Sequence, residues 1–144
     1  MAPFIQGAIM ANLTFVPSSQ GLTEILNRAT NKSATDTWKL HVNSNSVVYS
    51  FTTVIGDVTE AANTTAQDIT PGNLDVVLAT PRAKLVYDGN IVIPIAGGPA
   101  TQNGYYITNQ AGTVLIGGVI AGPRTLADGD DFVLSGFEIS LKAE

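Results

Sequence analysis

The sequence predicts an all-β protein: an antiparallel β-sandwich of jelly-roll type, with one short N-terminal helix and an extended N-terminal arm. Three observations predict this class. Short runs of alternating apolar and polar residues recur along the chain, as in strands with one buried face. The 14 Gly and 7 Pro lie scattered between these runs, which is typical of many tight turns. The 144 residues suffice for one core and not for two, so we expect a single domain of many short strands.

The composition argues against several function classes. The net charge is −5 and Lys and Arg form no run, so a nucleic-acid partner is not expected. The chain has no Cys, and therefore neither a disulfide framework nor a zinc site built on thiolates. Only 13% of the residues are charged, and Thr, Asn, Ser and Gly make up much of the rest. Such a surface suits a β-rich assembly protein better than a cytosolic enzyme.

The two ends of the chain differ in character. We expect residues 1–20 to form an extended arm and residues 21–144 to form the β-sandwich domain. Residues 1–23 carry no charged side chain. They lack the basic start of a signal peptide, and Pro3 and Pro17 interrupt them, so we expect neither a secretion signal nor a membrane span.

The arm has the pattern of a half-buried strand, because apolar and more polar residues alternate up to Phe15. Two interpretations stay open: the arm is the first strand of its own core, or it leaves the domain and lies on a neighbouring subunit. Large apolar side chains dominate interface energetics, so the expected partner-binding residues are those of the arm. They are Phe4, Ile5, Ile9, Leu13 and Phe15.

The first half of the domain predicts a helix followed by a hairpin. Leu22, Ile25 and Leu26 share a face of a helix over about residues 21–29. A strand with one wet face is predicted at 38–42, followed by a turn and a second strand at 47–55, and these two runs predict a hairpin.

Residues 56–73 contain few large apolar groups and predict a long surface loop. Strands follow at 74–79, 83–87 and 91–95, the last two separated by a turn signal at 88–90, Asp-Gly-Asn.

The final third is the most regular part of the sequence. Runs at 104–108 and 113–120 flank the turn residues 109–112 and predict a second hairpin. A further turn at 127–130 leads into a last alternating strand that ends at residues 137–141.

No catalytic constellation is visible in the sequence, and we expect no enzyme, no cofactor and no resident metal. A hydrolase triad needs His41 between a carboxylate and a hydroxyl, but this only histidine lies on the polar face of a predicted strand without a nucleophile-elbow motif. Asp128, Asp130 and Asp131 offer oxygen ligands for calcium, yet their spacing lacks the glycine and distal glutamate of a calcium loop, so a solvated turn is favoured. Gly117-Gly118 lacks phosphate-loop spacing and indicates a strand bulge.

Three stretches carry a family resemblance: residues 104–115 (GYYITNQAGTVL), 123–130 (PRTLADGD) and 137–141 (FEISL). They resemble tailed-bacteriophage virion proteins of the tail-fibre-like and capsid decoration (cement) type. The helix-then-strand opening, Gly21 to Asn27 followed by 38–42, is similar to the opening of such proteins. Residues 46–98 carry no such resemblance.

The resemblance implies a β-sandwich that works by adhesion, with no catalytic residues. We therefore expect a non-enzymatic capsid cement protein on the virion surface, a homotrimer that binds the major capsid protein and copies of itself. Neither nucleic acid nor a membrane is expected as a partner. The alternative is a tail-fibre or baseplate module that links tail parts or binds a glycan on the host surface. A carbohydrate-active or esterase-like enzyme stays open as a third class, because fold does not fix function.

Overall fold

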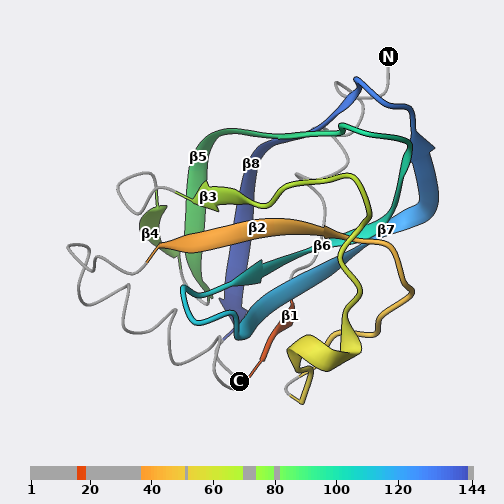
Figure 1. Ribbon diagram of the computed structural model, residues 1–144. Coiled ribbons are helices and arrows are strands. Elements are labelled where there is room, and N and C mark those ends of the chain that lie inside the picture. Colours follow the sequence, from red (N-terminus) through yellow and green to blue (C-terminus); the bar gives the residue numbers. More distant parts are fainter. Residues whose placement is uncertain (1–15, 19–36, 51, 70–73, 80–81, 143–144) are drawn as a thin grey trace.

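The computed structural model describes residues 16–18, 37–50, 52–69, 74–79 and 82–142, and the statements below concern these residues. They form an all-β protein with two antiparallel sheets and one turn of 3-10 helix (Figure 1). The larger sheet has the strand order β1-β7-β6-β2-β3, and the smaller has the order β4-β5-β8. The elements are β1 (Val16–Pro17), β2 (Trp38–Asn43), η1 (Ile55–Asp57), β3 (Gln67–Ile69), β4 (Leu74–Ala79), β5 (Arg82–Pro94), β6 (Ala100–Thr108), β7 (Val114–Leu126) and β8 (Asp131–Lys142).

Strands β5 to β8 are one long two-stranded ribbon that is folded across itself. β6 and β7 pair on either side of the turn at residues 109–113, and β5 and β8 continue the pairing from Pro94↔Asp131 to Arg82↔Lys142. Between the two halves the ribbon passes from the five-stranded to the three-stranded sheet. Accordingly, β5 and β8 run steeply across β2, β6 and β7 in Figure 1.

The corner of the ribbon is closed by short backbone contacts. The Ile95 amide donates to the Asp130 carbonyl at 3.0 Å, and the Gly129 amide donates to the Ile95 carbonyl at 2.9 Å. Gly129 has a φ of 89°, a conformation that glycine adopts at little cost. The turn predicted at 127–130 is confirmed.

A loop from the other half of the chain fixes this corner from outside. Asn63 has a φ of 63°, its carbonyl accepts from the Ala96 amide at 3.0 Å, and its side-chain amide donates to the Pro99 carbonyl at 2.8 Å. A Cβ on Gly98 would lie 2.9 Å from Asn63 Nδ2, so only glycine leaves room for this clamp. Residues 61–64 thus hold the two sheets in their crossed arrangement.

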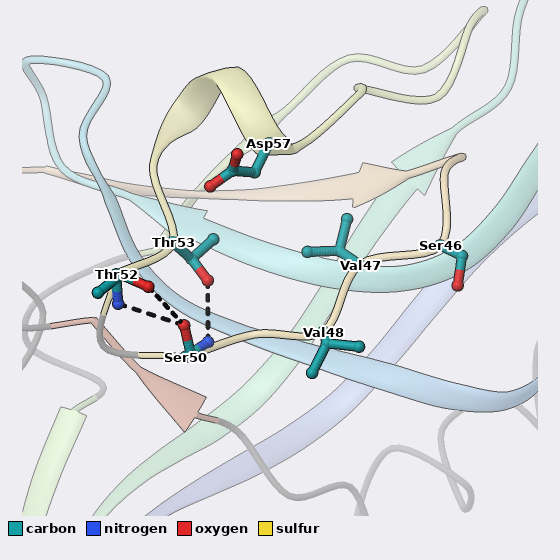
Figure 2. Close-up of a pocket in the computed structure, with 7 residues that line it drawn as sticks. All are labelled: Ser46, Val47, Val48, Ser50, Thr52, Thr53 and Asp57. Carbon is teal, nitrogen blue, oxygen red and sulfur yellow. Dashed lines mark hydrogen bonds between the residues drawn. The ribbon is translucent and has the colours of Figure 1, made fainter.

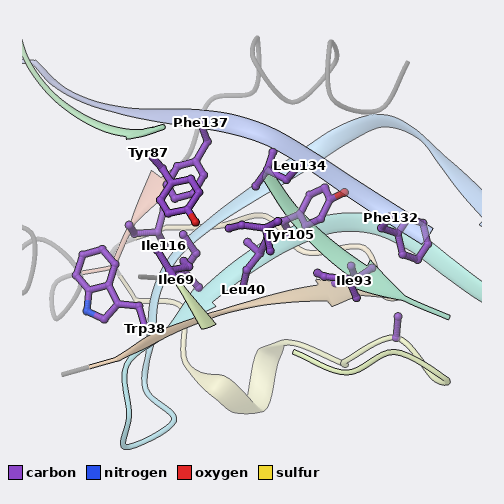
Figure 3. Close-up of a cluster of buried hydrophobic side chains, with 14 of the residues drawn as sticks. Trp38, Leu40, Ile69, Tyr87, Ile93, Tyr105, Ile116, Phe132, Leu134 and Phe137 are labelled. Atoms are coloured by element: carbon purple, nitrogen blue, oxygen red, sulfur yellow. The ribbon is translucent and has the colours of Figure 1, made fainter. Parts of the chain in front are cut away.

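Both sheets supply the main core, which lies between them (Figure 3). On β2 the residues Trp38, Leu40 and Val42 point into the core and are fully buried, while Lys39 and His41 lie on the other face. This is the alternation that the sequence predicts for a strand with one buried face. The largest fully buried members are Trp38, Tyr105, Phe132, Leu40, Ile69, Ile93, Ile107, Leu115, Ile116 and Leu134.

The prediction of a first hairpin is wrong. β2 pairs with β6 and β3, and the described residues between 44 and 54 form no strand. Val47 and Tyr49 are buried while Val48 is exposed, so the segment has the alternation of a strand. It has this pattern because it lies over the outer face of the five-stranded sheet, and every second side chain points toward that sheet.

The turn predicted at 88–90 is also wrong, because β5 runs through it as a bulge. The register with β8 shifts between Tyr87 and Asn90, and Gly89 and Gly136 take φ values of 156° and 79°. Two glycines thus bend the ribbon without ending it.

Two smaller differences concern the loop at 56–73 and the corner at Pro123. The loop contains the short strand β3. Pro123 lies within β7, where the pairing with β6 is interrupted between Gln102 and Gly104. The helix predicted at residues 21–29 and residues 1–15 of the arm lie outside the described residues, whereas β4, the hairpin β6–β7 and the final strand are confirmed.

We predict that Gly117→Ala destabilises the protein by about 1–3 kcal/mol, because a Cβ at this position would overlap the ring of Tyr49. Gly56→Ala is the matched control, since nothing lies within 4 Å of the added Cβ, and we expect a change within about 0.5 kcal/mol. Urea unfolding followed by the fluorescence of Trp38, which is the only Trp and is fully buried, measures both. Equal stability of the two variants would contradict the prediction.

Candidate functional site

The outer face of the five-stranded sheet carries most of the polar contacts that link distant parts of the chain. Residues 44–60, here called the covering loop, lie over this face. The ends of the loop meet, because Asn43 and Glu60 form a β-bridge and the Ser44 amide donates to the Thr59 carbonyl at 2.9 Å. A loop with adjoining ends that packs its own side chains is an Ω-type loop, a type that is frequently functional.

Beneath the covering loop lies a second, smaller apolar cluster. Val47, Tyr49, Tyr106 and Val114 are buried together, with Val58 packed against them. The ring of Tyr49 sits where a side chain at residue 117 would be. The Tyr49 hydroxyl donates to Asn43 Oδ1 at 3.0 Å, so the phenol is anchored at both ends. The position of the Tyr49 ring explains why residue 117 is a glycine. The pairing of Gly117 with Tyr106 is regular, so the predicted strand bulge at 117–118 is wrong.

Burial keeps the two tyrosines of this cluster neutral. Desolvation raises the pKa of Tyr49 well above its ordinary value of 10.0, and the neighbouring Tyr106 raises it further. Desolvation likewise raises the pKa of Tyr106, with an added contribution from the Glu60 carboxylate. The neutral Tyr49 phenol can thus donate its hydrogen bond to Asn43.

His41 links the covering loop to the sheet. Its Nδ1 lies 2.8 Å from Glu60 Oε1, and its Nε2 lies 2.9 Å from Thr108 Oγ1. Its ring stacks on Tyr106 with centroids 4.5 Å apart and an interplanar angle of 11°. The antiparallel register His41↔Tyr106 brings Thr108, two residues farther along β6, to the same face.

The order carboxylate, imidazole, hydroxyl is that of a hydrolase relay, the arrangement of His41 that the sequence itself argues against. The residues are 19 and 67 positions from His41, so no local spacing signals them. Thr108 is only 2% exposed, and it is not among the residues that line the pocket on the covering loop. A nucleophile must be reached by its substrate, and the Thr108 hydroxyl is buried in this structure. The chain of contacts instead fastens the covering loop.

The covering loop also bears a shallow pocket of about 290 Å³ (Figure 2). Its hydroxyl groups are used within the loop: Thr53 Oγ1 accepts from the Ser50 amide at 2.8 Å, and the Ser50 and Thr52 hydroxyls lie 3.0 Å apart. The pocket is therefore a polar surface depression whose donors and acceptors largely satisfy one another. Its lining residues are Ser46, Val47, Val48, Ser50, Thr52, Thr53 and Asp57.

Two aspartates of the acidic cluster, which the sequence predicts to be a solvated turn, accept hydrogen bonds at the corner of the ribbon. Asp128 Oδ1 accepts from the Gly97 amide at 2.9 Å, and Asp130 Oδ2 accepts from the Ala127 amide at 3.1 Å. Within the described ranges, no three His, Asp or Glu side chains gather in an arrangement that could hold a metal ion. The carboxylates are thus engaged by backbone amides.

The predicted partner-binding residues Phe4, Ile5, Ile9, Leu13 and Phe15 lie outside the described residues. The structure describes the chain that follows them. Val16 and Pro17 pair with Gly117 and Ile116, and Ser18 donates through its hydroxyl to the Val114 carbonyl at 2.7 Å. The arm therefore meets the domain at the edge of the five-stranded sheet.

Comparisons with known proteins identify no relative. No protein-family model matches the chain, no curated protein matches its sequence, and no solved structure matches its fold. In the part of the chain that the structure describes, no helix is long and apolar enough to cross a membrane.

We predict that His41→Ala lowers the free energy of unfolding by about 1–3 kcal/mol, because it removes the imidazole partner of the buried Thr108 hydroxyl and the ring that stacks on Tyr106. Lys39→Ala is the control on the same strand: its ion pair with Asp68 is exposed and should contribute less than about 1 kcal/mol. Urea unfolding measures both variants. A cost for His41→Ala no larger than that for Lys39→Ala would show that the relay does not fasten the loop.

A second prediction concerns alkaline pH. The folded-state pKa of Tyr49 is raised, so above pH 10 the unfolded chain releases a proton that the native protein keeps, and stability falls as pH rises. The fall contributed by one such group is at most about 1.4 kcal/mol per pH unit. Tyr49→Phe should therefore lose stability less steeply between pH 10 and 11, while being less stable near pH 7 by about 1 kcal/mol for its lost hydrogen bond. Parallel pH curves for the two proteins would overturn the assignment.

Proposed function

We propose that this chain is a non-enzymatic structural protein of a bacteriophage virion, a capsid decoration or cement protein that binds the outside of the head and stabilises it. In this proposal the protein is a homotrimer on the capsid surface, with the major capsid protein as its partner. Stabilisation follows from mass action, because the subunits bury surface only in the assembled shell.

The observation that carries the proposal is the uncharged arm and its point of attachment. Residues 1–23 hold no charged side chain but several large apolar ones, and burying such a segment is favourable only against another surface. Residues 16–18 attach it to the rim of the five-stranded sheet through β1. An apolar segment joined at a rim is suited to contact a neighbouring subunit in an assembly. The proposed contacts are Phe4, Ile5, Ile9, Leu13 and Phe15.

The folded ribbon supports the finer fold assignment, a jelly-roll-like β-sandwich. In jelly rolls a long antiparallel ribbon wraps so that its two halves join opposite sheets. Here β6–β7 belong to one sheet and β5–β8 to the other. The resemblance of residues 104–115, 123–130 and 137–141 to phage decoration and tail-fibre-like proteins points in the same direction.

A hydrolase is the competing class that one observation favours, namely the Glu60–His41–Thr108 contacts. The buried Thr108 hydroxyl weighs against it. If a broad panel of ester and glycoside substrates is hydrolysed and His41→Gln abolishes the activity, the non-enzymatic proposal is wrong.

We predict that the purified protein cosediments saturably with undecorated heads of the parent virus, at a fixed ratio to the major capsid protein. Deletion of residues 2–15 should abolish this binding, while the deleted protein keeps the circular dichroism spectrum of the all-β domain. Val92→Ser, at a partly exposed position on β5 of the smaller sheet, is the control and should bind as the wild type does. A stable oligomer that does not bind phage heads would exclude a cement role and favour a tail-fibre or baseplate module.

A further inference from the structure

The covering loop exposes three large apolar side chains to solvent within a short stretch of sequence. Val48 is 91% exposed, Val54 59% and Ile55 50%, all within eight residues of the chain. Residues 42–56 contain no charged side chain. Single exposed apolar residues are common on protein surfaces, but several together on an uncharged segment mark a contact site. These three side chains are called the valine patch below.

The valine patch stands on a rigid support. Asn45 donates from Nδ2 to the Asp57 carbonyl at 2.9 Å and accepts at Oδ1 from the Thr59 amide at 2.8 Å, which ties the two sides of the loop together. The Asp57 carboxylate accepts from the Val54 amide at 2.9 Å. Tyr49 anchors the loop from below. The loop therefore loses little conformational entropy when a partner covers it.

The polar groups of the loop point to the same conclusion. In most surface loops polar side chains face the water, whereas here Asn45, Ser50 and Asp57 bond to the backbone or side chains of the loop itself. The side chains of the valine patch are therefore exposed among polar side chains, several of which already have partners within the loop. The uncharged stretch at residues 42–56 is complementary to an apolar, uncharged segment.

We propose that the valine patch binds the N-terminal arm of a second copy of this chain. The arm is uncharged and apolar, so its chemistry matches the patch. It enters the domain beside the patch, because Val16 pairs with Gly117, the residue on which Tyr49 of the covering loop rests.

A second copy, and not the same chain, fits the geometry better. Residues 8–15 contain neither Gly nor Pro, and their alternation predicts an extended strand of about 26 Å at 3.3 Å per residue. β1 lies at the rim of the sheet, beside β7, whereas the covering loop stands on the face. Because β1 is the edge strand, the arm starts at the rim of the domain, where a neighbouring copy can be reached. Arms that each reach the next copy generate a closed ring, as the proposed homotrimer requires.

Cysteine cross-linking tests this inference, since the chain has no Cys of its own. Tagged Val48→Cys protein is mixed under a mild oxidant with untagged protein that carries one of Ile9→Cys, Leu13→Cys or Phe15→Cys. We expect a disulfide-linked heterodimer, identified by its mass, for at least one arm position, because a disulfide forms only when the two Cα atoms approach within about 7 Å. Val92→Cys, on the smaller sheet, is the matched control and should give none.

Light scattering on the purified protein provides the second measurement. The wild type should be an oligomer, and Val48→Asp should raise its dissociation constant about tenfold or more, because a charge enters an apolar contact. Val92→Asp adds the same charge elsewhere and should leave the mass unchanged. The inference is overturned by a monomeric wild type, by a Val48→Asp oligomer as stable as the wild type, or by the absence of a heterodimer at all three arm positions.

The inference rests on the proposed function only in that the arm is buried in an assembly, and the two can fail separately. Cross-linked copies that ignore phage heads would refute the cement role and leave the arm contact in place. Binding to phage heads without any cross-link between the arm and a second copy would refute the arm contact and leave the cement role in place.

Discussion

The fold depends on one constraint: the ribbon β5–β8 must turn a corner between two sheets without leaving its backbone groups unpaired. Ile95 at this corner is 2% exposed, and a buried amide or carbonyl without a partner costs about as much as a lost hydrogen bond. The contacts of Ile95 with Gly129 and Asp130 supply these partners within the ribbon, and Asn63 supplies them from outside. Because the corner is fixed, the two halves of the ribbon face each other and enclose one core.

Folding the ribbon leaves the outer face of the five-stranded sheet to be covered by something else. The chain between β2 and β3 provides that cover, held by Tyr49 over Gly117 and by His41 between Glu60 and Thr108. The register of β2 against β6 decides which side chains meet there. The candidate site is thus a consequence of sheet order, and its chemistry serves first to keep the cover in place.

The sequence predicted those elements whose local pattern matches their tertiary surroundings. β2 alternates because one face is core, and the turn at 127–130 carries the glycine that its backbone needs. The covering loop and the bulge at Gly89 were mistaken for a strand and a turn, because alternation and turn residues look the same in both settings. His41, Glu60 and Thr108 could not be grouped, since their meeting depends on strand order, and no local pattern encodes that order.

The fold determines that the side chains of the valine patch are exposed, but it does not determine that they are apolar. Val47 and Tyr49 must point toward the sheet to fill the cluster beneath the loop, so position 48 must point to water. Nothing in that geometry requires Val48 to be apolar, and Ser or Thr would fit the same backbone while being better solvated. The same holds for Val54 and Ile55, which flank the single turn of η1 at its exposed start. Three apolar side chains at positions that the fold leaves free are a cost to the isolated domain, and a partner surface offsets that cost.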